Sequence, residues 1–168
     1  EDIGESALLF CERVKSKSIQ LHEVREETEM NKILVVDDSS DIRLLLSRTL
    51  KAAGYTVSEA TDGDEVLAAT LSYEPDMILL DVAMARIDGF KALAQLKHDP
   101  RTKGIPVIMV TAKGHPSDLE TARTLGALDY INKPWAHGEV ELRVQWAITS
   151  VARKREQEAQ AKLDRLAG

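Results

Sequence analysis

The sequence has a single cysteine, few aromatic residues and no long hydrophobic run. Because Cys11 is the only cysteine, no disulfide can form within the chain, which excludes a small disulfide-stabilised domain and is typical of a reducing compartment. No apolar stretch approaches the roughly 18 residues of a membrane-spanning helix. The first residues lack the basic segment and apolar run of a secretory signal. We therefore expect a cytoplasmic protein without a membrane span.

Basic residues are fewer than acidic residues. The chain has 22 Lys and Arg against 28 Asp and Glu, for a net charge of -6. Proteins that bind nucleic acid hold its phosphates with clustered Lys and Arg. The one basic run, 153–155, lies in a mixed-charge tract and is interpreted as a solvated helix face. No direct nucleic-acid partner is expected.

From Lys32 onward, short apolar runs alternate with longer amphipathic stretches, the pattern of alternating strands and helices. Most of the runs lack polar alternation, as expected for parallel strands that are buried on both faces. The predicted strands are 33–36, 56–60, 77–80, 105–110 and 128–131, and the predicted helices are 40–53, 64–72, 90–98, 118–125 and 138–167. The pattern predicts an α/β fold, a (βα)5 doubly wound parallel sheet of five strands. In such sheets, ligand sites lie at the carboxyl ends of the strands.

Helical extensions are predicted at both ends of this domain. Residues 1–30 contain no proline, and Phe10, Val14, Leu21 and Val24 recur at helical spacing, which predicts an extension of the coiled-coil kind that packs on a partner helix. The last predicted helix has its apolar positions mainly in its first half, so its second half is expected to project from the domain. The predicted parts are therefore 1–30, 31–151 and 152–168. We expect a homodimer that forms through the terminal helices.

Polar residues stand where the apolar strands end. Asp37 and Asp38 follow the first strand, Asp81 the third and Thr111 the fourth, and Lys133 comes just after the fifth. All five side chains should converge on one edge of the sheet. Crowded carboxylates repel one another unless a cation neutralises them, and oxygen ligands of this kind suit Mg²⁺ or Mn²⁺. A carboxylate, a metal, a hydroxyl and an ammonium group together predict an acyl-phosphate site.

These motifs resemble the receiver domain of two-component response regulators. The segments that carry the resemblance are KILVVDDSSD, ILLDVAMARIDG, VIMVTA and DYINKPW, and the similarity covers about residues 31–151. It implies a flavodoxin-like strand order of 2-1-3-4-5. It also implies a signalling domain, rather than a classical enzyme, that catalyses its own phosphorylation and dephosphorylation. The phosphoryl group would come from a phosphohistidine on a sensor histidine kinase or a phosphotransfer protein, and its arrival would switch an output or a dimer interface, within a larger signalling protein.

Site roles follow from the resemblance residue by residue. It implies that Asp81 accepts the phosphoryl group. It further implies that Asp38, Asp81 and the main-chain carbonyl of Ala83 ligate Mg²⁺, with Asp37 acting directly or through water. Thr111 would grip the phosphoryl group.

The resemblance also assigns residues around the fifth strand. Lys133 would hold the phosphoryl group together with Thr111, and the Lys133–Pro134 bond would be cis. Thr111 would move inward after phosphorylation, and Tyr130 would turn to follow it. Tyr130 has an alternative interpretation as a half-buried aromatic residue with a hydrated hydroxyl.

One position departs from the family pattern, and two others carry an open question. The family often has Met-Pro in the loop after the acceptor, where this chain has Met84-Ala85, so the backbone is less constrained. Ala83 and Lys113 occupy positions that influence hydrolysis in the family. We hypothesise that Lys113 hinders the attacking water.

Three other functions compete with this interpretation. Aspartyl-phosphate phosphatases place a second Asp two residues after the nucleophile, but that position holds Ala83 after Asp81 and Ser39 after Asp37. Flavodoxins share the strand order, but the acidic segment VVDDSSD would repel a flavin phosphate. A phosphorylation-independent interaction domain becomes the better interpretation if the acidic site binds no metal. A stand-alone regulator is the alternative to a receiver within a larger protein.

Overall fold

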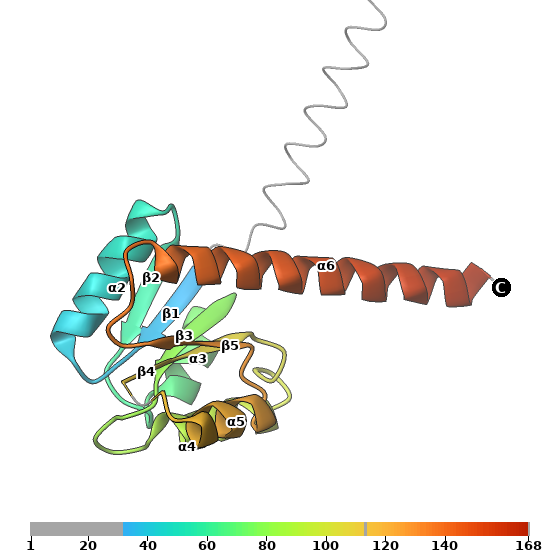
Figure 1. The fold of residues 1–168 in the computed structure, drawn as a ribbon. Coiled ribbons are helices and arrows are strands. Elements are labelled where there is room, and N and C mark those ends of the chain that lie inside the picture. The colour runs from blue at the N-terminus through green and yellow to red at the C-terminus, as the bar shows by residue number, and fades with distance from the viewer. Residues whose placement is uncertain (1–31, 113, 168) are drawn as a thin grey trace, which may run out of the picture. The chain divides into compact units, whose positions relative to one another are not determined.

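The computed structural model of the protein describes residues 32–112 and 114–167 (Figure 1). The elements are, in chain order, β1 (Lys32–Val36), α2 (Ser40–Ala52), β2 (Thr56–Ala60), α3 (Val66–Tyr73), β3 (Met77–Asp81), α4 (Gly89–His98), β4 (Val107–Thr111), α5 (Pro116–Thr124), β5 (Asp129–Asn132) and α6 (Glu139–Ala167). The strands form one parallel sheet in the order β2-β1-β3-β4-β5, which confirms the predicted α/β fold and strand order. The N-terminal extension predicted for 1–30 lies outside the described residues, as does Lys113.

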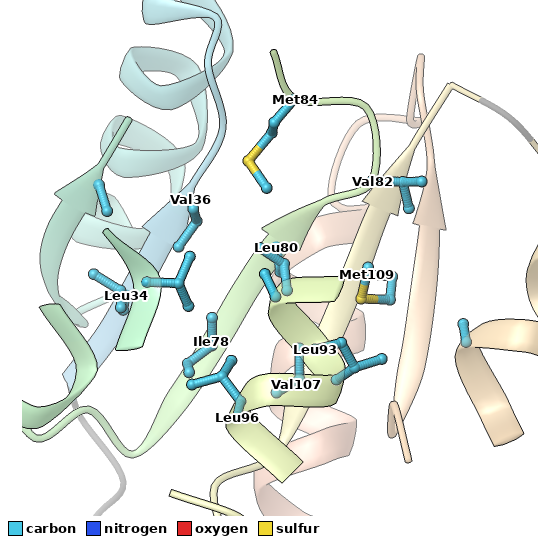
Figure 2. Packing of buried hydrophobic residues seen from close by; sticks show 14 residues of the cluster. Leu34, Val36, Ile78, Leu80, Val82, Met84, Leu93, Leu96, Val107 and Met109 are labelled. Carbon is cyan, nitrogen blue, oxygen red and sulfur yellow. The ribbon is translucent and has the colours of Figure 1, made fainter. Parts of the chain in front are cut away.

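Helices cover both faces of the sheet. Figure 1 shows α2 and α6 along one face and α3, α4 and α5 along the other. Both faces are apolar, because β3 and β4 are buried along their whole length, as expected of central parallel strands. On the face covered by α3, α4 and α5, Leu34, Ile78, Leu80, Val107 and Met109 belong to one buried cluster that includes Leu93 and Leu96 of α4 (Figure 2).

Side-chain caps and a glycine define several helix ends close to the predicted positions. The Ser39 hydroxyl accepts a hydrogen bond from the Ile42 N–H at 3.5 Å, and Asp88 Oδ1 accepts one from the Lys91 N–H at 3.0 Å. Gly54 follows α2 with a φ of 95°, a conformation that favours glycine and ends the helix. These caps set the start of the two helices that follow β1 and β3.

Three predicted boundaries are wrong by two residues. The helix predicted from Asp118 begins at Pro116. The strand predicted from Ile105 begins at Val107, because the Ile105 N–H donates to the Thr102 carbonyl in a turn and Pro106 has no N–H to donate. The helix predicted from Asp64 begins at Val66. Asp62 does not cap it, since its carboxylate accepts hydrogen bonds from a different loop.

The last helix has a buried part and an exposed part. Val140, Val144 and Ala147 are fully buried against the sheet, whereas every residue from 152 to 166 is exposed. The second half of α6 therefore extends beyond the packed domain, as Figure 1 shows. Among the described helices, none is long and apolar enough to cross a membrane.

Candidate functional site at the carboxyl edge of the sheet

Three carboxylates meet where β1 and β3 end. Asp37 directly follows β1, and Asp81 is the last residue of β3; their side chains are 1% and 3% exposed. Asp38 is exposed beside them. One carboxylate oxygen from each of the three residues lies within 4.8 Å of the other two. Adjacent parallel strands that end at the same edge of the sheet bring these side chains together.

Lys133 joins the two buried carboxylates. Its Nζ donates to Asp37 Oδ2 at 2.6 Å and to Asp81 Oδ1 at 3.0 Å, across 96 and 52 residues of sequence. Burial alone lowers the pKa of Lys133, but the hydrogen bonds and charges of Asp37 and Asp81 outweigh this effect and raise it. The ammonium group is therefore charged in the folded protein and holds both acids.

The surroundings of Asp81 raise the pKa of its carboxyl group. Burial raises its pKa, and the negative charge of Asp37 raises it further. The hydrogen bond and charge of Lys133 and the Ala83 main chain act in the opposite direction without cancelling the rise. Folding therefore disfavours the ionised form of Asp81, which lies next to the buried Asp37.

The donor set fits a divalent cation of the magnesium type. Among the described residues, the cluster brings three carboxylates together with one ammonium group, which bridges two of them. Asp38 is exposed, which leaves the cluster open to solvent on one side. Mg²⁺ prefers oxygen ligands and is usually bound by one or two carboxylates while it keeps several waters. A divalent ion would reduce the repulsion among the three carboxylates.

Thr111 and Lys133 are linked through the main chain at the same edge. Thr111, 2% exposed, is the last residue of β4, and its carbonyl accepts a hydrogen bond from the Lys133 N–H at 2.7 Å. The Lys133–Pro134 bond is cis, as predicted. Tyr130 is half-buried on β5, paired in register with Met109, and the Arg143 guanidinium lies over its ring at 5.8 Å.

The loop after Asp81 packs tightly onto the strand end. The Val82 N–H donates to the Val110 carbonyl at 3.1 Å, and the Gly89 N–H donates back to the Val82 carbonyl at 2.8 Å. A Cβ at position 89 would lie 2.0 Å from the Asp81 carbonyl oxygen, so only glycine fits there. Between these anchors, Ala83 is exposed and the Met84 side chain turns back toward the core (Figure 2).

Sequence reasoning missed two residues that support this edge. Arg43, on the first turns of α2, donates from its Nη1 to the Asp37 carbonyl at 2.7 Å, and its Nε lies 3.5 Å from Glu59. Its position six residues after Asp37, near the start of a helix, was the available signal. Asp62, 7% exposed, accepts hydrogen bonds from the Arg86 and Ile87 N–H groups, a contact for which no local sequence pattern exists.

Comparison with known families settles what kind of domain this is. The family model for the response regulator receiver domain matches residues 33–145, well over half of the chain. The chain belongs to the response regulator receiver domain family. Receiver domains are signalling domains of two-component systems, and the fold and the acidic cluster on this edge agree with that membership.

Curated relatives of this receiver domain are transcriptional regulators. The chain is 40% identical over 116 residues to the DNA-binding dual master transcriptional regulator RpaA of Synechocystis, covering 69% of this chain and 48% of the relative. It is 41% identical over 120 residues to the transcriptional regulatory protein ResD of Bacillus subtilis, covering 71% and 49%. The chain spans about half the length of the curated relatives it matches. DNA binding is a property of RpaA as a whole, so the absence of a direct nucleic-acid partner stays a prediction for residues 1–168.

Solved structures show the same fold. The chemotaxis protein CheY4 of Vibrio cholerae aligns with a TM-score of 0.66 at 33% identity, covering 71% of this chain and 99% of that one. The receiver domain of a signal transduction histidine kinase from Syntrophus aciditrophicus aligns with a TM-score of 0.67 at 31% identity, covering 73% and 93%. Receiver domains thus occur in both kinases and regulators among the proteins that this chain resembles.

Proposed function

We propose that this receiver domain accepts a phosphoryl group on Asp81 from the phosphohistidine of a sensor histidine kinase or phosphotransfer protein. The observation that carries the proposal is the bridge from Lys133 Nζ to Asp37 and Asp81, with the exposed Asp38 beside it. Ionisable groups with perturbed pKa values cluster at functional sites, and this site combines a buried acid with a raised pKa, an ammonium group and an accessible second acid.

The proposed reaction is a transfer between two nucleophiles. An Asp81 carboxylate oxygen attacks phosphorus, the new O–P bond forms, and the N–P bond to the donor imidazole breaks. The imidazole nitrogen keeps the electron pair and is then protonated. Lys133 is within hydrogen-bonding distance of Asp81 Oδ1, so its ammonium group can shift from the carboxylate to an oxygen of the arriving phosphoryl group. Thr111, at the end of the neighbouring strand, contributes its hydroxyl.

The same proposal assigns the metal ligands. Asp38, Asp81 and the Ala83 carbonyl would hold Mg²⁺ or Mn²⁺, with Asp37 bound directly or through water. When bound, the ion supplies charge neutralisation of the transferring phosphoryl oxygens. The supporting observation is the cluster of three carboxylates, of which Lys133 bridges two.

We assign the switch to Thr111 and Tyr130. A phosphoryl group bound by Lys133 would draw the Thr111 hydroxyl inward, and Tyr130 on the neighbouring strand β5 would respond. Arg143 holds Asp129 at 3.0 Å and lies over the Tyr130 ring, so a rotation of Tyr130 would disturb the contact between β5 and α6. The signal would leave the domain through this helix.

We also propose that residues 31–151 form the receiver, that 1–30 and 152–168 are its extensions, and that these extensions pair two copies of the chain. Leu163 and Leu166 support the pairing, because they are 61% and 78% exposed near the end of α6. The 168-residue chain should be dimeric by light scattering, and Leu163→Glu combined with Leu166→Glu should shift it toward monomer. Gln157→Glu, an exposed change on the same tract, is the control. An unchanged mass for the leucine variant would refute pairing through α6.

The acceptor is tested by mass spectrometry. The full chain is incubated with Mg²⁺ and acetyl phosphate, and its intact mass is compared with that of Asp81→Asn and of Asp76→Asn, an aspartate just before β3 at the opposite edge of the sheet. One added phosphoryl group is expected on the parent and on Asp76→Asn, and none on Asp81→Asn. A parent that gains no phosphoryl group and shows no Mg²⁺-dependent change would favour the phosphorylation-independent interaction domain.

A further inference from the structure

Asp62 lies in the connection between β2 and α3 and makes contacts that its neighbours in sequence do not explain. It is 7% exposed, and its carboxylate accepts three main-chain hydrogen bonds. Oδ1 accepts from the Gly63 N–H at 2.6 Å and from the Ile87 N–H at 3.3 Å, and Oδ2 accepts from the Arg86 N–H at 3.2 Å. Two of these donors are 24 and 25 residues away, in the loop that follows Asp81.

The two loops also touch at other points. A Cβ at position 63 would lie 2.5 Å from the Ile87 carbonyl oxygen, so the backbones approach closely there. Arg86 Nη1 donates to Asp64 Oδ2 at 3.0 Å, but this ion pair is exposed and contributes little. The Asp62 carboxylate is the buried polar group in the contact between the two loops.

The loop between β3 and α4 is thus anchored at both ends, and between them the Met84 side chain packs into the core. Its first anchor is the Val82 main chain, and its second is the pair of N–H groups that Asp62 accepts. Ala83 and Ala85 lie between the two anchors and are exposed. Neither alanine restricts φ as a proline would, so the path of the loop depends on the anchors.

We propose that Asp62 is a positioning residue for the acceptor loop: its three main-chain hydrogen bonds fix the segment that presents the Ala83 carbonyl to the metal site. The inference rests on the proposed function, because Ala83 matters only as a ligand. Without the Asp62 carboxylate, the Arg86 and Ile87 N–H groups lose their acceptor and the loop gains alternative paths. Partners that orient a ligand in this way typically change metal affinity by on the order of 10- to 100-fold when they are removed.

The test is Mg²⁺ binding by calorimetry on the unphosphorylated full chain. Asp62→Ala should raise the Kd for Mg²⁺ by on the order of 10-fold or more. Asp62→Asn should lie between, since its amide oxygen still accepts from Gly63 and Ile87, while its NH₂ group cannot accept from Arg86. Thr102→Val is the matched control, because Thr102 is 1% exposed and donates to the Leu96 carbonyl at 2.8 Å in the connection that leads into β4 at the far edge of the sheet. It should lose stability and keep the parental Kd.

A second readout needs no metal. Amide hydrogen exchange at Arg86 and Ile87 should be faster in Asp62→Ala than in the parent, and unchanged in Thr102→Val. A folded Asp62→Ala protein with the parental Kd and parental exchange would overturn the inference. If Asp62→Ala does not fold, the same comparison is made with Asp62→Asn. A parent that binds no Mg²⁺ contradicts the proposed function instead, and exchange at Arg86 and Ile87 then decides whether Asp62 fixes the loop.

Discussion

Replacing Lys133 with methionine removes the ammonium group that holds Asp37 and Asp81, and leaves a side chain of similar length. The ammonium lies 2.6 and 3.0 Å from two carboxylates that are 1% and 3% exposed. At an effective dielectric of about 20, unit charges about 4 Å apart attract by about 4 kcal/mol. Part of this gain offsets the burial of the ammonium, so removing one partner of such a buried cluster is expected to cost about 3–5 kcal/mol. The Lys133 side chain is 17% exposed, which favours the lower end, about 3 kcal/mol.

Urea unfolding at pH 7, followed by circular dichroism, measures this loss. In the presence of EDTA, Lys133→Met should unfold with about 3 kcal/mol less free energy than the parent. Added Mg²⁺ should recover part of the loss, because a bound cation supplies the missing positive charge, and each tenfold excess over its Kd adds about 1.4 kcal/mol. Lys103→Met, at an exposed lysine, is the control. A loss below about 1 kcal/mol in EDTA would refute the electrostatic reasoning, since that is the range of surface pairs.

Three further predictions concern the same edge of the sheet. The pKa of Asp81 in the folded protein lies above its ordinary value of 3.8. Without divalent ions, the contribution of Asp81 to stability is therefore fully present below pH 3.8 and is lost as pH rises through the raised pKa. Urea titrations across pH should show this dependence in the parent and not in Asp81→Asn. The Cβ of Gly89→Ala would lie 2.0 Å from the Asp81 carbonyl oxygen, so this variant should lower the free energy of unfolding by about 1–3 kcal/mol or more. Gly104→Ala, which has open space around its Cβ, should leave the free energy of unfolding unchanged. Equal effects of the two variants would contradict the packing argument. Arg43→Met should lower the free energy of unfolding by about 1.5–3 kcal/mol, because it removes a charged donor to the Asp37 carbonyl. Arg48→Met, at an exposed arginine, should change it little. Thermal melting curves that do not differ between the two variants would contradict a supporting role for Arg43.

The fold was predictable because its signals are local. Parallel strands that are buried on both faces give short apolar runs, and the helices between them begin at side-chain caps such as Ser39 and Asp88. Strand ends of a doubly wound sheet meet at one edge, which is why Asp37, Asp81 and Lys133 could be grouped from the sequence alone.

The remaining features depend on contacts between distant loops. Asp62 precedes a helical pattern and resembles a helix cap, but its carboxylate bonds to amides 24 and 25 residues away, and no periodicity records such a contact. Pro106 was inside a predicted strand, yet the absence of an N–H at that residue places the strand start at Val107. The roles of Thr111 and Tyr130 as switch residues stay predictions, because a single conformation does not contain the movement.

The most direct test of the account is to locate the phosphoryl group itself. The full chain is phosphorylated with acetyl phosphate and Mg²⁺, treated with borohydride to reduce the acyl phosphate to an alcohol, digested, and mapped by peptide sequencing in a mass spectrometer. The account predicts homoserine at position 81, and none in a sample prepared without Mg²⁺. Homoserine at position 37 or 38, or its absence from every peptide of a folded protein, would contradict the claim that Asp81 is the acceptor.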